Sequence, residues 1–174
     1  KPQNLRLRQH MKDELSHYAS DTWDIEYHYP SGWGEITGIA NRTDYDLKQH
    51  MKFSGKDLSL FDEAAKEKVI PHVIEPAFGL DRILFTLLID AYSEKTEKDE
   101  IKVVLSLNQQ VSPADVAIFP LMKKDGLSEK AQEVASSMRK QKIAVIYDEA
   151  GSIGKRYARV DEIGVKWAVT VDYD

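Results

Sequence analysis

The chain has 174 residues, no cysteine and a formal net charge of −5. Without cysteine it forms neither disulfides nor thiolate metal sites, which fits a reducing compartment. Because the chain is acidic, nucleic acid is not the expected partner by charge alone, and any contact with RNA must come from a local basic patch. No apolar run approaches the roughly 18 residues of a membrane span, and the first ten residues lack both an initiating Met and a signal-peptide core. We expect no membrane partner, and we expect the chain to be a piece of a longer protein.

The first 40 residues predict a helix followed by an antiparallel hairpin, as in an α+β domain. Residues 5–19 have a rough apolar stripe at helical spacing, which predicts a helix. TWDIEYHY (22–29) alternates apolar and polar residues, which predicts a strand with one solvated face. Its apolar face is Trp23, Ile25, Tyr27 and Tyr29, and its solvated face is Asp24, Glu26 and His28. The turn signal PSG and the alternating run WGEITGIA then predict an antiparallel hairpin.

Residues 41–68 are polar and mixed, with a short helix predicted over 45–51 and Asp44 as its N-cap. VIPHVIEP (69–76) indicates a buried strand. Residues 80–92 are too long and too apolar for an ordinary strand, so they predict a buried helix.

The composition changes after residue 92. The charged stretch SEKTEKDEIK (93–102) indicates a linker or a frayed helix end. Apolar strands in DVAIFPL (115–121), IAVIYD (143–148) and VKWAVTVD (165–172) then alternate with predicted helices over 128–141 and 152–164. Ser128 is the expected N-cap of the first of these helices. Strands that alternate with helices favour a parallel sheet, so we expect an antiparallel α+β domain over 1–100 and an α/β domain over 101–174.

VIEPAFGLDRILFTLL (73–88) is the stretch with the clearest chemistry. Gly79 precedes the predicted helix and lets a ligand approach the backbone, and the free N–H groups of the first turn attract anions. Arg82 lies in that turn, where its planar guanidinium can contact a phosphate or stack on a ring, although a cation there opposes the helix macrodipole. The alternative is that Arg82 only pairs with a neighbouring carboxylate.

EPAFGLDRILFTLL resembles motif 3 of the class II aminoacyl-tRNA synthetases, a strand followed by a helix with a Gly-x-x-Arg signature. Four further stretches, in order along the chain, make the sequence most similar to the glycyl-tRNA synthetases of the dimeric, archaeal and eukaryotic-like type. LRLRQHMKDELSHYASDTWD is similar to that family's segment after motif 2, and GWGEITGIANRTDYDLKQH to its most specific signature. VIPHVIEP is similar to the approach to motif 3, and GSIGKRYARVDEIGVKWAVTVDYD to the anticodon-binding domain.

The resemblance implies the C-terminal part of an antiparallel class II catalytic core, followed by an α/β anticodon-binding domain that is truncated at its C-terminus. It implies ATP-dependent formation of glycyl-adenylate and transfer of glycine to tRNA(Gly), by a cytoplasmic homodimer that uses ATP and Mg²⁺. Motifs 1 and 2 of the family would precede residue 1, so we expect this piece to be inactive alone. The chemistry needs no covalent enzyme intermediate, and no catalytic residue is assigned.

The family's binding residues transfer to three groups of positions. The residues implied to bind ATP are Glu35, Ile36, Gly79, Leu80, Asp81 and Arg82, with Glu35 also beside the Mg²⁺ that ATP carries. The residues implied to bind glycine are Glu75, Pro76, Ala77, Phe78 and Gly79. The residues implied to contact the tRNA anticodon are Lys155, Arg156 and Arg159, with Tyr157 available for stacking. For the last group, a solvated helix face is the alternative.

Several alternatives stay open. Alternation puts Glu35 on the face of Trp33 and Thr37, where it is either a site residue or an outward-facing strand carboxylate. Glu75 either pairs with the substrate ammonium or caps the following helix, and Ala77 stands where the family usually has serine. The alternative functions are a synthetase for proline, threonine or histidine, and a non-catalytic RNA-binding or accessory relative.

Overall fold

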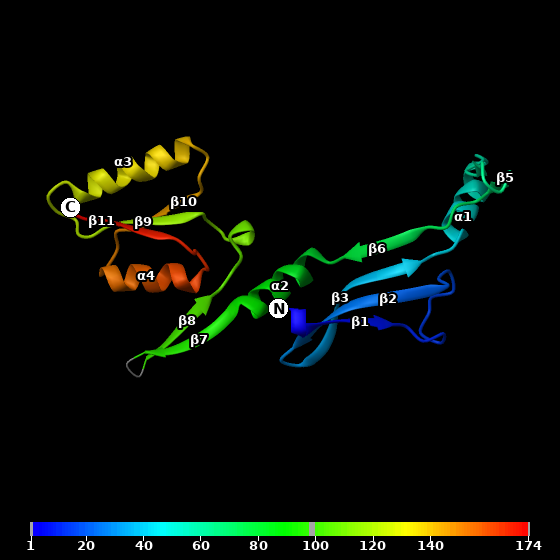
Figure 1. Ribbon diagram of the computed structural model, residues 1–174, viewed down its shortest axis with the longest axis horizontal. Coiled ribbons are helices and arrows are strands. Elements are labelled where there is room, and N and C mark those ends of the chain that lie inside the picture. Colours follow the sequence, from blue (N-terminus) through cyan, green and yellow to red (C-terminus); the bar gives the residue numbers. More distant parts are fainter. Residues whose placement is uncertain (1, 98–99, 174) are drawn as a thin grey trace. The chain divides into compact units, whose positions relative to one another are not determined.

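The computed structural model describes residues 2–97 and 100–173. The chain divides into two compact units, Lys1–Thr86 and Leu87–Asp174, and each is described by itself (Figure 1). The division lies within α2 (Leu80–Ala91), before the boundary predicted after residue 100. Among the described residues, no helix combines the length and the apolar character that crossing a bilayer requires.

The first unit is built on an antiparallel sheet in the order β1-β2-β3-β6 (Figure 1). Its strands are β1 (Leu5–Gln9), β2 (Asp21–Tyr29), β3 (Gly32–Asn41) and β6 (Ile74–Phe78), and a 3₁₀ turn, Pro2–Asn4, precedes them. The helix α1 (Tyr45–Ser54) and the hairpin of β4 (Leu60–Asp62) and β5 (Glu67–Val69) lie between β3 and β6 in the chain. The predicted hairpin of β2 and β3 and the helices that begin at Tyr45 and Leu80 are confirmed. The burial predicted for the helix over 80–92 is wrong, because Leu80, Leu84 and Phe85 are exposed.

The predicted helix over residues 5–19 is wrong. Leu5 and Leu7 alternate with Arg6 and Arg8 in a strand, and β1 pairs along its whole length with β2. The period of two was present in LRLRQ, but the wider apolar spacing obscured it. Pairing with β2 supplies the backbone hydrogen bonds that decide the conformation.

The buried strand predicted over 69–76 is also wrong. The strand β6 begins only at Ile74, and all five of its residues are exposed. It is an edge strand of the sheet that the described residues form, with β3 on one side only. Its apolar composition therefore does not correspond to burial in this chain.

The second unit begins with an antiparallel hairpin of β7 (Tyr92–Glu97) and β8 (Glu100–Leu105). The linker or frayed helix end predicted over 93–102 is therefore wrong, although residues 98–99 lie outside the described residues. A 3₁₀ turn, Gln109–Val111, follows. The predicted parallel sheet is confirmed, in the order β10-β9-β11. Its elements are β9 (Val116–Pro120), α3 (Leu127–Lys140), β10 (Val145–Tyr147), α4 (Ile153–Glu162) and β11 (Ala168–Val171).

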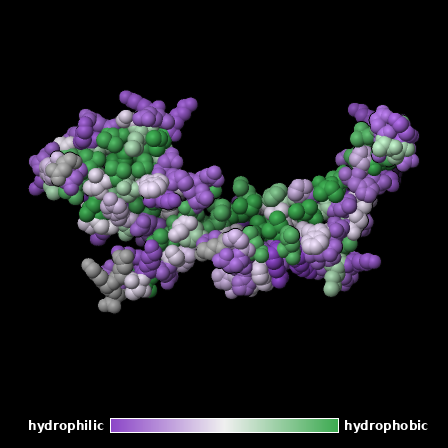
Figure 2. Space-filling view, in the orientation of Figure 1, coloured by the Kyte–Doolittle hydropathy of each residue, from purple (hydrophilic) through white to green (hydrophobic). Residues whose placement is uncertain are grey.

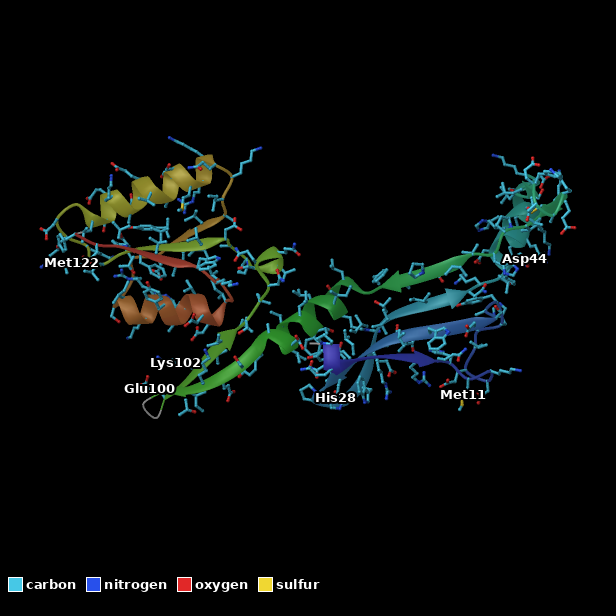
Figure 3. The ribbon with its side chains drawn as sticks, viewed as in Figure 1. Met11, His28, Asp44, Glu100, Lys102 and Met122 are labelled. Atoms are coloured by element: carbon cyan, nitrogen blue, oxygen red, sulfur yellow. The ribbon has the colours of Figure 1, made fainter. Side chains whose placement is uncertain are left out.

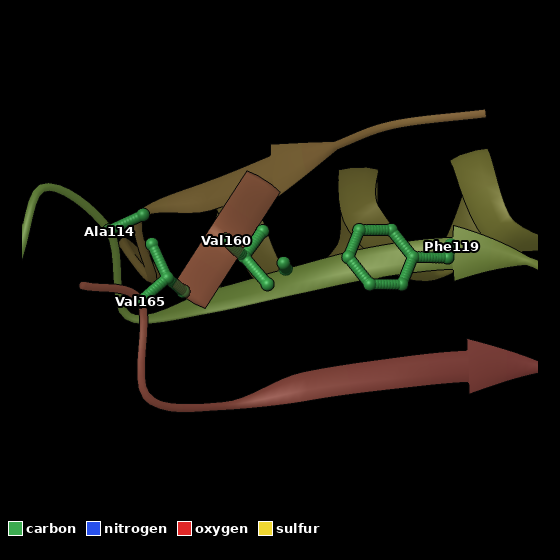
Figure 4. Packing of buried hydrophobic residues seen from close by; sticks show 5 residues of the cluster. Ala114, Phe119, Val160 and Val165 are labelled. Carbon is green, nitrogen blue, oxygen red and sulfur yellow. The ribbon is translucent and has the colours of Figure 1, made fainter. Parts of the chain in front are cut away.

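The core of the second unit has three layers, with the sheet between its two helices. All five residues of β9 are buried, as expected of a strand covered on both faces. Phe119 packs with Val160 of α4 on one face (Figure 4), whereas Ile118 packs with Ala131 and Ala135 of α3 on the other. Ser128 is not the N-cap, because α3 begins one residue earlier, after Gly126.

Candidate functional site

One face of the first sheet gathers charged and small side chains. Residues directly opposite one another on neighbouring strands lie on the same face, so the strand pairing assigns the members of this face. We call it the charged face. Its members are Arg6, Arg8, Thr22, Asp24, Glu26, His28, Trp33, Glu35, Gly38, Ala40, Glu75 and Ala77.

A β-bulge in β3 brings Glu35 onto this face. Ile25 lies opposite Thr37, but the next residue, Glu26, lies opposite Glu35, so Ile36 is an extra residue without a partner. An extra residue reverses the alternation of side chains beyond it. Glu35 therefore shares a face with Trp33, as predicted, but not with Thr37, where the prediction was wrong.

The register also divides the residues implied to bind glycine. Glu75 lies opposite Ala40, and Ala77 lies opposite Gly38, so both belong to the charged face. Pro76 and Phe78 lie on the opposite face, across from Ile39 and Thr37. Within this group, only Glu75 and Ala77 have side chains on the side where the charged groups gather.

The predicted solvated face of β2 is buried where its carboxylates lie. Asp24 and Glu26 are only 7% and 8% exposed. Glu26 accepts a hydrogen bond from Arg6 Nε at 2.5 Å, and Asp24 lies 2.7 Å from His10 Nε2. Charged side chains are buried when they are paired. Here the strand that was predicted as a helix supplies Arg6 to Glu26 and places Arg8 Nη1 3.8 Å from Asp24.

Sequence reasoning missed this cluster of Arg6, Arg8, His10, Asp24 and Glu26. The period-two alternation of LRLRQ was the signal that could have found it, because a strand beside β2 places Arg6 and Arg8 opposite the two carboxylates. Figure 3 shows the sheet with its side chains, with His28 beside the β2–β3 turn and Asp44 at the opposite end, where α1 begins.

Arg82 reaches the bulged end of β3. Its Nη1 donates to the backbone carbonyl of Glu35 at 3.1 Å and lies 3.4 Å from the Glu35 carboxylate. Both side chains remain about half exposed, at 51% and 47%. The carboxylate of Glu35 thus supplies the counter-charge for a cation at a helix N-terminus, and exposure leaves both groups accessible to a ligand.

An open cavity of about 470 Å³ lies at this junction. Its lining residues are Glu35, Ile36, Ala77, Phe78, Gly79, Leu80, Asp81 and Arg82. The six residues implied to bind ATP are all among them, although they come from segments more than forty residues apart. The volume lies within the roughly 300–1,000 Å³ usual for small-molecule sites.

The first half of α2 is anchored by Tyr29 of β2. The Tyr29 hydroxyl lies 2.5 Å from Thr86 Oγ1, and the Tyr29 ring stacks on Phe85 with 5.8 Å between centroids. Thr86 in turn donates to the backbone carbonyl of Arg82 at 2.7 Å. These contacts fix the helix turn that carries Arg82. Figure 2 shows apolar side chains over α2, where Leu80, Leu84 and Phe85 are exposed.

The three basic residues of α4 differ in their surroundings. Arg156 is 3% exposed, and its guanidinium donates to the backbone carbonyls of Pro120 and Gly151. It is therefore removed from any surface that RNA could reach, which corrects its assignment to the anticodon. Arg159 pairs with Asp148, with Nε 2.8 Å from the carboxylate, and Lys155 is exposed.

Tyr157, expected to be available for stacking, is partly engaged in the fold. Its ring packs edge-on against Phe119, with 5.3 Å between centroids, and its hydroxyl lies 2.9 Å from Thr170 Oγ1. It keeps 39% exposure, so part of its ring surface remains open.

Comparison with known proteins gives two findings. The family model "Anticodon binding domain" matches residues 115–174, and these residues carry the parallel sheet of the second unit. Proteins named glycine–tRNA ligase are similar along the whole chain. That of Caldanaerobacter subterraneus subsp. tengcongensis is 52% identical over 174 residues, that of Clostridium kluyveri 50% over 175 residues, and that of Geobacillus kaustophilus 47% over 175 residues. In each case the match covers all of this chain and 37% of the relative, so the chain spans just over a third of the length of these proteins.

Proposed function

We propose that this chain is part of a glycine–tRNA ligase, which activates glycine with ATP and transfers it to tRNA(Gly). The observation that carries the proposal is the cavity at which Arg82 meets Glu35, since the residues implied to bind ATP line it together. The similarity of the whole chain to proteins named glycine–tRNA ligase supports the same reaction. In this proposal the first unit is the C-terminal part of a class II catalytic core.

The cavity fits a nucleotide. The planar guanidinium of Arg82 can stack on a base or bind phosphate oxygens through parallel hydrogen bonds. Glu35 would hold Mg²⁺, because this ion is commonly bound by one or two carboxylates together with substrate phosphates. When bound, Mg²⁺ would neutralise charge on the phosphates. The residues of the chain itself then hold the nucleotide at the end of the charged face.

Glycine would bind farther along the same face. Glu75 offers a carboxylate to its ammonium group, in a charge-assisted hydrogen bond. Gly38 and Ala77 lie opposite one another between Glu75 and Glu35, and together they provide a surface with almost no side chain. A site built this way accepts an amino acid without a side chain and excludes larger ones sterically.

The second unit would bind the tRNA. The anticodon-binding family match supports this role, and Lys155 and Arg159 remain the candidate contacts after the burial of Arg156 is taken into account. We further propose that the full-length protein is a homodimer of the archaeal and eukaryotic-like type and works in the cytoplasm. These assignments rest on the five stretches that resemble the glycyl-tRNA synthetases, which occur in the same order along the chain, and on the proposed reaction, the attachment of glycine to tRNA.

The experiment is amino-acid-dependent exchange of pyrophosphate into ATP, catalysed by the full-length gene product that contains this chain. Glycine should support exchange, whereas proline, threonine and histidine should not, and tRNA(Gly) should accept glycine. Exchange with one of the other amino acids would identify a different synthetase. RNA binding without any exchange would identify an accessory protein and overturn the proposal.

A further inference from the structure

Arg42 lies at the end of β3, next to Glu75, and is held on several sides. Its Nη1 donates to Glu75 Oε2 at 2.7 Å. The side chain of Arg42 is 21% exposed, whereas that of Glu75 is 47% exposed. The arginine is thus the fixed member of the pair, and the carboxylate is the member that solvent or a ligand can reach.

Asp46, in the first turn of α1, binds the other edge of the same guanidinium. Arg42 Nε donates to Asp46 Oδ2 at 2.6 Å and Nη2 donates to Oδ1 at 3.0 Å. This bidentate arrangement fixes the plane of the guanidinium and leaves Nη1 for Glu75. The two carboxylates raise the pKa of the Arg42 guanidinium above its ordinary value, Asp46 more strongly than Glu75.

Tyr18 covers one face of the guanidinium. The central carbon of Arg42 lies 4.1 Å from the centroid of the Tyr18 ring, within the range of a cation–π contact. The ring has aromatic neighbours of its own, since Tyr18 lies 5.1 Å from His17 and 6.1 Å from Tyr45 between centroids. Tyr45 directly precedes Asp46, so one helix start supports both contacts.

The backbone brings Arg42 and Glu75 together. The Arg42 amide donates to the Val73 carbonyl at 2.9 Å, and the Val73 amide donates to the Thr43 carbonyl at 2.8 Å. These two bonds continue the pairing of β3 with β6 past Asn41 and Ile74. Three segments, near residues 18, 42–46 and 73–75, therefore meet at one guanidinium.

We propose that Asp46 and Tyr18 are positioning residues, which fix the Arg42 guanidinium and through it hold the Glu75 carboxylate in the orientation that binds the substrate ammonium. This inference rests on the proposed function. Without the bidentate pair with Asp46 and the contact with the Tyr18 ring, the Arg42 side chain can rotate about its bonds. Glu75 then loses its fixed partner. The effect is specific to glycine, because ATP is held at Arg82 and Glu35.

The test uses pyrophosphate exchange by the full-length gene product, with glycine and ATP varied separately. Asp46→Asn and Tyr18→Leu should each raise the KM for glycine about ten-fold, an effect of the size expected when binding interactions are removed, while the KM for ATP stays within about two-fold. Tyr18→Phe keeps the ring and should behave like the wild type. Asp44→Asn is the matched control, because Asp44 is the N-cap residue of the same helix but pairs with Lys48 at 2.5 Å.

A double variant separates positioning from damage to the fold. Because Asp46 acts through Glu75, the Asp46→Asn change should matter little once Glu75 is replaced. The KM for glycine of the double variant should therefore exceed that of Glu75→Gln alone by less than two-fold. Equal losses for glycine and ATP, or fully additive effects, would overturn the positioning role while leaving the function intact. If Glu75→Gln itself leaves the KM for glycine unchanged, the proposed glycine site is wrong, and this inference fails with it.

Discussion

Glu35 and Gly38 lie on the same face of the first sheet, although they are three residues apart on one strand. In a regular strand they would point to opposite faces. The extra residue Ile36 reverses the alternation, so that a Cβ placed on Gly38 would lie 3.7 Å from Glu35 Oε1. The bulge thus joins the Arg82 end of the charged face to the part where Ala77 and Glu75 lie.

Replacing Arg82 should weaken ATP use. In the full-length protein, Arg82→Ala should raise the KM for ATP or lower kcat/KM by about ten-fold or more, because the cavity loses its planar cation. The KM for ATP of Arg82→Lys should lie between those of the wild type and Arg82→Ala, since lysine keeps the positive charge but lacks the planar guanidinium. The measurement is exchange at varied ATP and saturating glycine. An unchanged ATP dependence would reduce Arg82 to an ion-pair partner of Glu35.

A methyl group at Gly38 should affect glycine binding and not the fold. The added Cβ would lie 3.5 Å from Asp24 Oδ1 and 3.7 Å from Glu35 Oε1, which are ordinary contacts. It would project from the charged face beside Ala77. We expect Gly38→Ala to raise the KM for glycine about ten-fold without changing the KM for ATP or the melting temperature. The control is Gly154→Ala in α4, where an added Cβ meets nothing within 4 Å. A glycine KM equal to that of the control would place the substrate elsewhere.

A hydroxyl at position 77 should help glycine modestly. Ala77→Ser adds one possible hydrogen bond, a net of about 0.5–1.5 kcal/mol, so kcat/KM for glycine should rise by about ten-fold at most. Discrimination against alanine as a substrate should hardly change. The side chains of Ala77 and of the introduced serine differ by one oxygen, so the shape of the binding surface remains. Aminoacylation with each amino acid measures both effects. If the serine variant sharpened discrimination a hundred-fold, the hydroxyl would be the selector.

Arg156 and Lys155 are neighbours with different expected roles. Arg156→Met removes the donor to the buried carbonyl of Pro120 and to the carbonyl of Gly151, so the second unit should lose about 1–3 kcal/mol of stability. Lys155→Met should change stability by less than about 0.5 kcal/mol but weaken tRNA binding. Urea unfolding and tRNA titration together distinguish the two. Loss of tRNA affinity in Arg156→Met without loss of stability would contradict the structural role.

Asp57 should stabilise the β4–β5 hairpin only above acid pH. Its carboxylate accepts hydrogen bonds from the Ser59 hydroxyl at 2.6 Å and the Ser59 amide at 2.9 Å, and it pairs with Lys68 at 3.0 Å. These partners, the Ser59 hydroxyl foremost, hold the pKa of Asp57 below its ordinary value of 3.8. A carboxylate with a lowered folded-state pKa stabilises fully above its unfolded-state pKa, and the contribution disappears as pH falls through the folded-state pKa.

The measurement is hydrogen exchange of the hairpin amides in the wild type and in Asp57→Asn, compared at the same pH so that the intrinsic exchange rates cancel. The wild type should be better protected at pH 6, and the difference should shrink steadily below about pH 4. Glu63→Gln is the control, because its pair with Lys66 is largely exposed and contributes little. If the difference in protection between the wild type and Asp57→Asn does not depend on pH, the charge of Asp57 does not stabilise the hairpin.

Much of the second unit could be predicted from the sequence, because its strands and helices have strong local signals. The β9 strand is a continuous apolar run, and α3 has Ala131 and Ala135 at helical spacing, so the α/β alternation follows from local patterns. The same reasoning failed at Arg156, where the sequence shows only a basic residue on a helix. Its burial depends on which face of α4 packs on the sheet.

In the first unit, local patterns were enough to predict the β2–β3 hairpin and the start of α2 at Leu80, and the candidate site residues came from the family resemblance. Local patterns did not show that residues 5–9 form a strand, that Asp24 and Glu26 are buried, or that Glu35 shares a face with Gly38. All three features depend on pairing between strands. A residue's face is set by its cross-strand partner, and an extra residue such as Ile36 becomes visible only when both strands are in place.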